Sequence, residues 1–379
     1  MTALSVVWRL AFATGLIVLA FAMAAPVLAV LLQQAGHGTV TVGAFAMIPF
    51  LMVALLIPVV PRVLARWGIV RAYRVGCVLQ LAAIAGYAIG DGLLVWSAAA
   101  VSGGIGAAAL WNATEALLAR EAPPDRRGRV MGLYQTGLGA ALALGPFVPA
   151  LLGWGARPVL WAGVVLVALC CAIAVAVPRH ATTEPPPHLT AGTWHALRAA
   201  PLLAAIALIG GVFEAGLASV SAAHASTTGL GLGAAASVAG AIGAGSFACQ
   251  YPAGYAADHF RPVSVFSAAA LLLFAASVAV AFAGVAPWLL WVAGVVWGGV
   301  GGALYTLAMV QVAHQFAGRA TAGGAAAMIT GYTAGGTLGP LASGMALDVA
   351  GVTGLAATLG LLALGALWAA RRIGPPARA

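Results

Sequence analysis

The sequence predicts an all-α polytopic membrane protein whose twelve transmembrane helices form two six-helix bundles related by pseudo-symmetry. The first supporting observation is composition: the 379 residues are 63% hydrophobic and only 7% charged, and the mean hydropathy is +1.04. Soluble chains are about half apolar and a quarter charged, so this chain has too little charge to cover a water-exposed surface. The other two observations are apolar runs long enough to cross a bilayer, at about 20 residues each, and a repeat that relates the two halves.

Apolar runs that end at charged residues, prolines or glycines define the expected spans. They lie near 9–32, 39–61, 71–90, 95–119, 130–153, 157–178, 201–226, 230–256, 262–284, 286–314, 320–345 and 351–370. The first run follows Arg9 and resembles a signal peptide, but it is longer than the roughly 7–15 residues of a signal core. Because eleven further spans need a first helix, we interpret this run as a membrane span.

A linker and an internal repeat predict the domain organisation. The segment 179–200 is the only stretch that resembles a linker, and it separates a bundle at 1–178 from a bundle at 201–379.

In the fifth span, the ten residues from Gly137 to Gly145-Pro146 align without gaps with those from Gly331 to Gly339-Pro340 in the eleventh span. The offset is 194 residues and five of the ten positions match. Because proline removes a backbone donor, each Gly-Pro pair is expected to bend its helix and pack it closely.

The distribution of arginine predicts the orientation of the chain. All 17 basic residues are arginine, and sixteen of them fall on one side when the spans are threaded in order, against Arg157 alone on the other. By the positive-inside rule, this asymmetry places both termini in the cytoplasm and favours an even number of spans. The net charge of +9 therefore reflects topology, so we expect the chain to contact the lipid bilayer and no nucleic acid.

The twelve spans, the cytoplasmic ends, the central linker and the repeat together resemble the major facilitator superfamily, over the whole chain. The family's most specific loop motif, Gly-x-x-x-Asp-Arg-x-Gly-Arg-Arg, lies between spans two and three, with an echo between spans eight and nine. The first loop here contains Arg62 and keeps the motif's Arg66 and Gly68, but Ala65 stands where the Asp belongs. The second loop keeps the Gly and the Asp, as Gly254 and Asp258.

The resemblance implies that these loops act as a conformational latch that opens during alternating access. Asp258 would meet Arg261 or a helix N-terminus, where the helix dipole favours a carboxylate. Two plainer readings stay open. Asp258 could serve only as a helix cap, and the arginine loop could serve only to set topology.

Other family motifs are partial. In the fourth span Gly104-Ile105-Gly106 is kept, but Ala100 replaces the arginine of proton-coupled members, which removes an arginine-based proton switch at that position. The fifth-span antiporter pattern is matched at Gly132, Gly145 and Pro146, which favours export, and it fails at Ala141, Pro149 and Ala150. Within the superfamily, the chain is similar to a bacterial group with Trp-x-x-x-Glu in the fourth span, here Trp111 to Glu115. That group also has a Gly-x-x-x-Glu start to the seventh span, here Gly210 to Glu214.

Two acids lie inside the expected spans, where ionisable residues are costly and default to functional candidates. Glu115 lies about 7 Å inside Arg120, and Glu214 lies about 20 Å beyond the cytoplasmic start of its helix. A carboxyl group in such a place is protonated, binds a cation or faces water, and each state suits proton coupling. For Glu115 an ion pair with Arg120 or Arg129 is the structural alternative. For Glu214 the alternative is a protonated carboxyl that bonds a neighbouring helix, while the surrounding glycines permit local unwinding.

Aromatic and amide residues near the expected centre of the bundle predict a cavity for a moderately apolar solute with a few hydrogen-bonding groups. On the seventh span Ser221 is expected to share the face of Glu214, with His224 one turn further. The full set of cavity candidates is Trp111, Asn112, Tyr134, Gln135, Ser221, His224, Gln250, Tyr251, Tyr305, Gln311 and Tyr332. With acids but no bases in the core, a cationic, zwitterionic or neutral solute is easier to accommodate than an anionic one.

A membrane-embedded enzyme is the main alternative from another class, and the sequence argues against it. The seven histidines are dispersed, and the sequence holds no metal-binding or nucleophile motif. The four cysteines lie in apolar runs, so we expect neither a metal site nor a cofactor. The predicted function is transport of a small organic solute by alternating access, coupled to protons, with export by proton antiport. Symport uptake and uncoupled facilitation are the alternatives. The resemblance places this multi-pass chain, as a monomer, in a bacterial inner (plasma) membrane.

Overall fold

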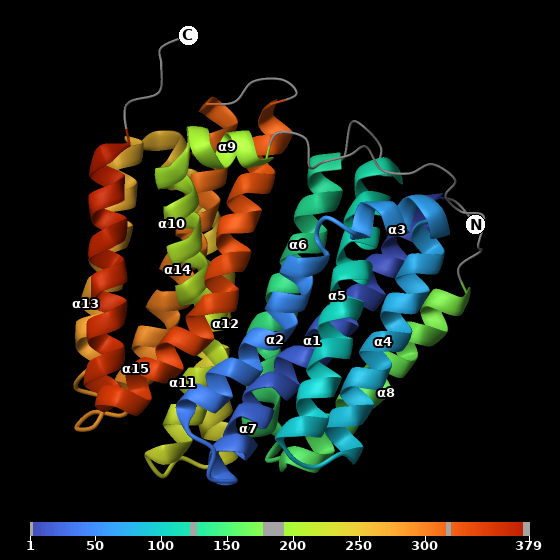
Figure 1. Ribbon diagram of the computed structural model, residues 1–379, viewed down its shortest axis with the longest axis horizontal. Coiled ribbons are helices and arrows are strands. Elements are labelled where there is room, and N and C mark those ends of the chain that lie inside the picture. Colours follow the sequence, from blue (N-terminus) through green and yellow to red (C-terminus); the bar gives the residue numbers. More distant parts are fainter. Residues whose placement is uncertain (1–2, 122–126, 177–192, 316–319, 374–379) are drawn as a thin grey trace. The chain divides into compact units, whose positions relative to one another are not determined.

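The computed structural model describes residues 3–121, 127–176, 193–315 and 320–373, and within these ranges the regular structure is helical (Figure 1). The helices that come first are α1 (Ala3–Gln34), α2 (Thr39–Leu56), α3 (Val60–Trp67), α4 (Ile69–Ile89), α5 (Leu93–Glu121), α6 (Arg127–Leu144), α7 (Val148–Leu152) and α8 (Ala156–Ala176). They are followed by α9 (Thr193–Ala199), α10 (Pro201–Gly211), α11 (Ala218–Thr227), α12 (Leu232–His259), α13 (Pro262–Val280), α14 (Leu289–Gln315) and α15 (Ala320–Arg372).

The helices agree closely with the twelve expected spans. Ten described helices are long and apolar enough to cross a membrane, and the bent pair α10–α11 with its π-helical turn provides an eleventh. Helix α15 joins the last two expected spans, and its backbone is non-helical at Ala350 and Gly351, where the predicted boundary falls. Gly351 has a φ of 59°, in the left-handed region that glycine adopts without a Cβ penalty. The chain is therefore a multi-pass membrane protein, as predicted.

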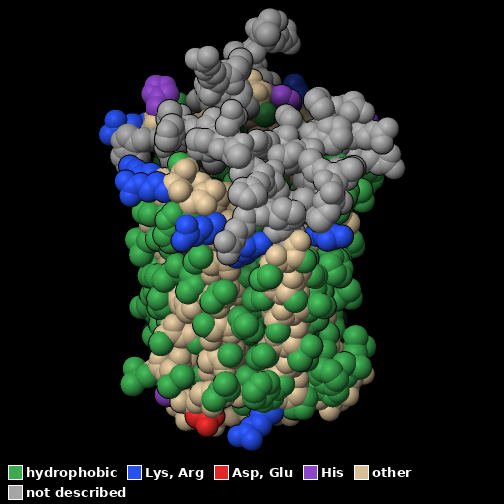
Figure 2. All heavy atoms as spheres, turned by 90° about the vertical axis from the view of Figure 1, so that its right-hand side faces the viewer, with side chains coloured by type: hydrophobic (Ala, Val, Ile, Leu, Met, Phe, Trp, Pro, Cys, Tyr) green, Lys and Arg blue, Asp and Glu red, His purple; other side chains and the backbone are tan. Residues whose placement is uncertain are grey.

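Hydrophobic side chains cover the middle of the molecular face drawn in Figure 2, and charged side chains gather toward its two ends. This is the pattern expected of a surface in contact with lipid, because a charge within the hydrocarbon region is costly.

The contacts of the chain define two compact units. Unit 1 contains Met1–Leu28 and Ile48–His188, and unit 2 contains Ala29–Met47 and Leu189–Ala379. Residues 179–192 of the predicted linker lie outside the described residues, and the remainder of the linker contains the short helix α9. The segment Ala29–Met47 differs from the predicted division, since it belongs to the first half by sequence but packs with unit 2.

The two units repeat the same packing at the 194-residue offset found in the sequence. In unit 1 a Cβ on Gly145 would lie 2.6 Å from the Cβ of Ala22 in α1. In unit 2 a Cβ on Gly339 would lie 3.1 Å from the Cα of Gly216, the residue at Ala22 plus the offset. The Gly-Pro element therefore packs against the first span of its own half in both units: against α1 in unit 1 and against the seventh span in unit 2. In the first half Gly145 to Phe147 form a 3₁₀ turn between α6 and α7, so this helix is irregular where predicted.

A second packing pair follows the same offset. A Cβ on Gly104 of α5 would lie 2.9 Å from the carbonyl oxygen of Pro49 in α2. A Cβ on Gly298, at the equivalent position in α14, would overlap the carbonyl oxygen of Ile242 in α12. Small residues let membrane helices approach backbone to backbone, so the glycine-rich strings are packing surfaces.

Candidate functional site

The candidate site is built on a break in the seventh span. Helix α10 passes into a π-helical turn at Val212–Gly216 and then into α11, with a bend of 45° between the helices. A glycine allows the seventh span to lie this close to α15, because a Cβ on Gly211 would overlap the carbonyl oxygen of Tyr332. π-turns inside helices are rare and concentrate at functional sites. The predicted local unwinding around Glu214 is therefore present.

Glu214 projects from this turn toward three other helices of unit 2. Ser246 of α12 donates its hydroxyl hydrogen bond to Oε1 of the carboxylate. Tyr332 of α15 donates a second hydroxyl hydrogen bond. On α14, a Cβ at Gly302 would lie 2.9 Å from the same oxygen, so the glycine leaves room for the carboxyl group. Residues from four elements thus meet at one acid, which is only half-buried.

A tyrosine pair and a hydroxyl–amide pair lie close to this acid, the second of them one helical turn beyond Ser246 and Gly302 along α12 and α14. The rings of Tyr305 and Tyr332 lie 4.7 Å apart between centroids. Next to Tyr305 on α14, Thr306 donates a hydrogen bond of 3.0 Å to Oε1 of Gln250 on α12. The acid, its two hydroxyl donors, the ring partner Tyr305 and the hydroxyl–amide pair form what we call the Glu214 cluster: Glu214, Ser246, Gln250, Tyr305, Thr306 and Tyr332.

The cluster has no cationic partner among the described residues. The described arginines of unit 2 lie at helix ends: Arg198 in the last turn of α9, Arg261 before α13, and Arg371 and Arg372 in the last turn of α15. An ionised carboxylate is an acceptor only, and two hydroxyl donors serve it. A protonated carboxyl is also a donor, and hydroxyl groups rotate to accept from it. The surroundings of Glu214 therefore satisfy both protonation states, which is what a group that binds and releases a proton needs.

The fourth-span acid is placed differently. Glu115 is exposed on α5, within electrostatic reach of the Tyr134 hydroxyl, which is buried without a hydrogen-bond partner among the described residues. Asn112 bonds back to the Ala108 carbonyl of its own helix at 2.8 Å. Trp111 is half-buried and Gln135 is exposed. The side chains of Arg120 and Arg129, the alternative partners of Glu115, lie outside the described residues.

Other predicted cavity residues do not join the Glu214 cluster. Ser221 has 3% of its surface exposed and His224 is half-buried, and in the described ranges neither bonds to Glu214. The π-turn and the bend alter the regular spacing that placed Ser221 on the Glu214 face. Tyr251 is 82% exposed.

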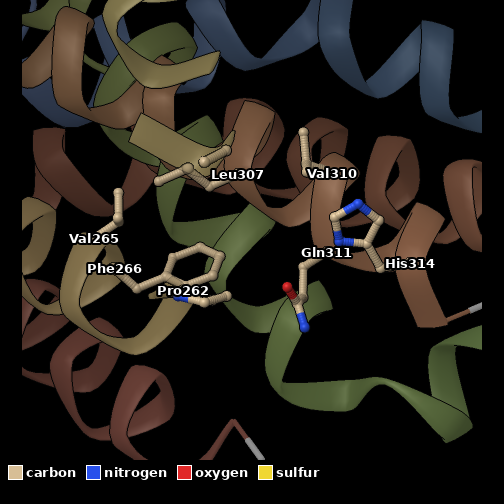
Figure 3. Close-up of a pocket in the computed structure, with 8 residues that line it drawn as sticks. Pro262, Val265, Phe266, Leu307, Val310, Gln311 and His314 are labelled. Atoms are coloured by element: carbon tan, nitrogen blue, oxygen red, sulfur yellow. The ribbon is translucent and has the colours of Figure 1, made fainter. Parts of the chain in front are cut away.

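Gln311 lines a separate cavity of about 200 Å³ with Pro262, Phe266 and His314 (Figure 3). It is 3% exposed, and its Nε2 has no partner in the part of the chain described. The residues that line this cavity belong to the end of α12, the start of α13 and the last turns of α14. Gln311 is six residues, or about 9 Å of helix, beyond Tyr305.

Among the described residues, no hydrogen bond or ion pair joins Asp258 to the partners predicted for the latch. Gly68 ends α3 with a φ of 77°, which explains the glycine, and Arg62 bonds the Pro58 carbonyl of its own segment at 3.4 Å. Arg66 is exposed. In the second loop, Asp258 lies in the last turn of α12 and is exposed, and no ion pair joins it to Arg261 among the described residues. Exposed ion pairs contribute little stability, so solvation of both side chains competes with the predicted contact.

The chain matches the sequence pattern of the Major Facilitator Superfamily over residues 10–248. It belongs to that superfamily. Similar solved structures include the nucleoside transporter NupG in a mutant form, with 12% identity and a TM-score of 0.78, covering 97% of this chain and 98% of that one. A D-xylose-proton symporter has 14% identity and a TM-score of 0.74, with the same coverage of both chains. No curated protein matches the sequence.

Membership of the Major Facilitator Superfamily makes the chain a transporter of small solutes and not an enzyme. The structural neighbours share its fold. Sequence reasoning found Glu214 and Tyr332 but missed Ser246 and Thr306. A single serine or threonine in a Gly- and Ala-rich span cannot be told from a small packing residue by sequence. Ser246 and Thr306 join the Glu214 cluster only because of how α12 and α14 are rotated about their axes.

Proposed function

We propose that this superfamily member is a proton-coupled secondary transporter of a small organic solute that works by alternating access and exports by proton antiport. Glu214 is the proton-binding group. The observation that carries the proposal is the half-buried carboxylate of Glu214, held by Ser246 and Tyr332 with no cationic partner among the described residues. A carboxyl in this setting exchanges a proton when its access to water changes.

The other residues of the Glu214 cluster would contact the solute. The Tyr305–Tyr332 ring pair offers apolar, planar contact, and Gln250 with Thr306 offers hydrogen bonds. This combination suits a moderately apolar solute with a few polar groups. A cationic, zwitterionic or neutral solute fits the acid better than an anion.

Symport uptake is the second candidate function. The antiporter pattern of the fifth span fails at Ala141, Pro149 and Ala150, which weakens the argument for export. A D-xylose-proton symporter is among the structurally similar proteins. Both candidates place the proton on Glu214 and differ only in the direction of the solute relative to the proton.

The test is thermal stabilisation of the purified protein by a broad solute library at two pH values. A ligand that binds only the native state at 100 times its Kd stabilises it by about 2.7 kcal/mol. We expect a hit whose stabilisation differs between the two pH values and is lost in Glu214→Gln. Asp91→Asn, at an exposed acid outside the predicted site residues, is the control, and Glu115→Gln tests the second predicted acid in the same way. Hits that persist unchanged in Glu214→Gln would contradict the assignment and favour a proton-independent facilitator.

A further inference from the structure

A group of hydrogen bonds outside the Glu214 cluster joins the start of α2 to α15. Asp348 accepts hydrogen bonds from two backbone amides of α2: Oδ1 from Thr39 N at 2.8 Å and Oδ2 from Val40 N at 3.1 Å. The Thr39 hydroxyl also lies 2.5 Å from Oδ1 and 2.8 Å from the Gly344 carbonyl oxygen. Both partners belong to unit 2, although they are 309 residues apart in sequence.

This carboxylate supplies the cap that α2 lacks. Gly38 occupies the N-cap position, because its carbonyl oxygen accepts the first helical hydrogen bond, from Val42 N at 3.2 Å. A helix N-terminus leaves several amides unpaired, and a side-chain oxygen at the N-cap normally accepts from one of them. Glycine has no side chain to do so. Asp348 accepts from Thr39 and Val40 instead, and its negative charge strengthens both bonds.

The backbones around this cap are in direct contact. A Cβ on Gly38 would lie 2.8 Å from Oδ2 of Asp348. A Cβ on Gly43 would overlap the Pro340 carbonyl oxygen, and one on Gly344 would overlap that of Thr39. Glycine at these positions lets the first two turns of α2 lie against α15. This contact explains why Ala29–Met47 packs with unit 2 while α2 from Ile48 onward packs with unit 1.

We propose that Asp348 is a positioning residue of the transport cycle: with Thr39 it forms a latch that holds the first turn of α2 on α15 and must open when the halves alternate. The proposal rests on alternating access, because the segment from Ala29 to Met47 belongs by sequence to the half that moves against α15. The latch is one-sided. At the 194-residue offset the equivalents of Asp348 and Thr39 are Trp154 and Gly233, which provide no carboxylate. Asp348 therefore favours the conformation in which α2 is docked.

Hydrogen–deuterium exchange measured by mass spectrometry on the full chain in lipid nanodiscs tests the latch without solute or proton gradient. In Asp348→Ala we expect exchange in residues 39–47 to rise at least tenfold and exchange in residues 246–251 to fall several-fold. The second change is decisive, because a cap with a purely structural role would affect only its own helix. Thr39→Val should give a smaller shift in the same direction, and Asp91→Asn, at another exposed acid, should give none.

Faster exchange in residues 39–47 with no fall in residues 246–251, or no change in either segment, would overturn the proposal. A second variant gives an independent answer if Asp348→Ala folds poorly. In Gly38→Cys/Asp348→Cys, oxidative cross-linking should slow exchange in residues 39–47 and stop transport of any solute identified by the stabilisation screen, and a reductant should restore it. Transport by fully cross-linked protein would also overturn the latch. Because the exchange readout uses neither Glu214 nor a solute, failure of the proposed proton coupling would leave it unaffected.

Discussion

At the scale of single residues, the proposed proton chemistry centres on Glu214, an acid that three other helices of unit 2 surround. Glu214 differs from Glu115 in its neighbours: Ser246 and Tyr332 donate to it directly, whereas Glu115 is exposed and reaches Tyr134 only electrostatically. Its side chain fits the space left by Gly302. Removal of its ability to carry a proton should therefore have a specific effect.

In reconstituted vesicles, we expect Glu214→Gln to fold normally and to lose the dependence of solute transport on an imposed pH gradient. The amide keeps the shape and the hydrogen-bonding capacity of the acid but does not exchange a proton at the working pH. Glu214→Asp should keep the pH dependence while the rate falls by about tenfold, or about 1.4 kcal/mol, because the shorter side chain reaches Ser246 and Tyr332 less well. Transport by Glu214→Gln that still follows the pH gradient would remove Glu214 from the coupling mechanism.

At the scale of helices, glycines decide which pairs come into contact. Gly298 lies against the Ile242 backbone in α12, and Gly104 plays the equivalent part for Pro49 in α2. Membrane helices gain little from hydrophobic burial, since lipid is as apolar as the helix interior, so close packing contributes most of their association. The glycine positions are thus more sensitive to substitution than their exposure suggests.

We expect Gly298→Ala to lower the stability of the folded protein by about 1–3 kcal/mol, the usual cost of overpacking, because the added methyl group meets the Ile242 backbone. Gly365→Ala is the matched control. A Cβ there has nothing within 4 Å, and alanine is about 1 kcal/mol better than glycine in a helix. The apparent melting temperature in detergent should fall for the first variant and stay level or rise for the second. Equal melting temperatures for the two would contradict the packing argument.

At the scale of the whole molecule, arginine placement sets the expected orientation in the membrane. Sixteen of the 17 arginines fall on one side of the twelve-span arrangement, and the described helices follow that arrangement closely. By the positive-inside rule, we expect both termini in the cytoplasm.

Reporter fusions check this orientation. Alkaline phosphatase joined after Gly284, in the turn between α13 and α14, should be active, because the expected orientation places that turn on the side away from the cytoplasm. The same enzyme joined after Ala379 should be inactive, whereas green fluorescent protein at that position should fluoresce. Phosphatase activity at the C-terminus would show that the span count is odd or that the orientation is reversed.

The sequence by itself determined the spans and the packing repeat. Span length and arginine bias are local signals that the bilayer imposes on the chain. The Gly-Pro repeat and the kink at Ala350 and Gly351 follow from residue types with strong backbone preferences. Glu214 was also predictable, because a carboxyl group within an apolar run is costly and therefore rare.

Only the tertiary structure decided which faces of the helices meet. It brought Ser246 to Glu214, directed Gln311 to a separate cavity, and set Asp348 against the first turn of α2. In a soluble protein a polar stripe reveals the outer face of a helix. In the membrane, lipid and protein interior are equally apolar, so the rotation of each helix is set by glycine contacts and hydrogen bonds that form only when the helices are assembled.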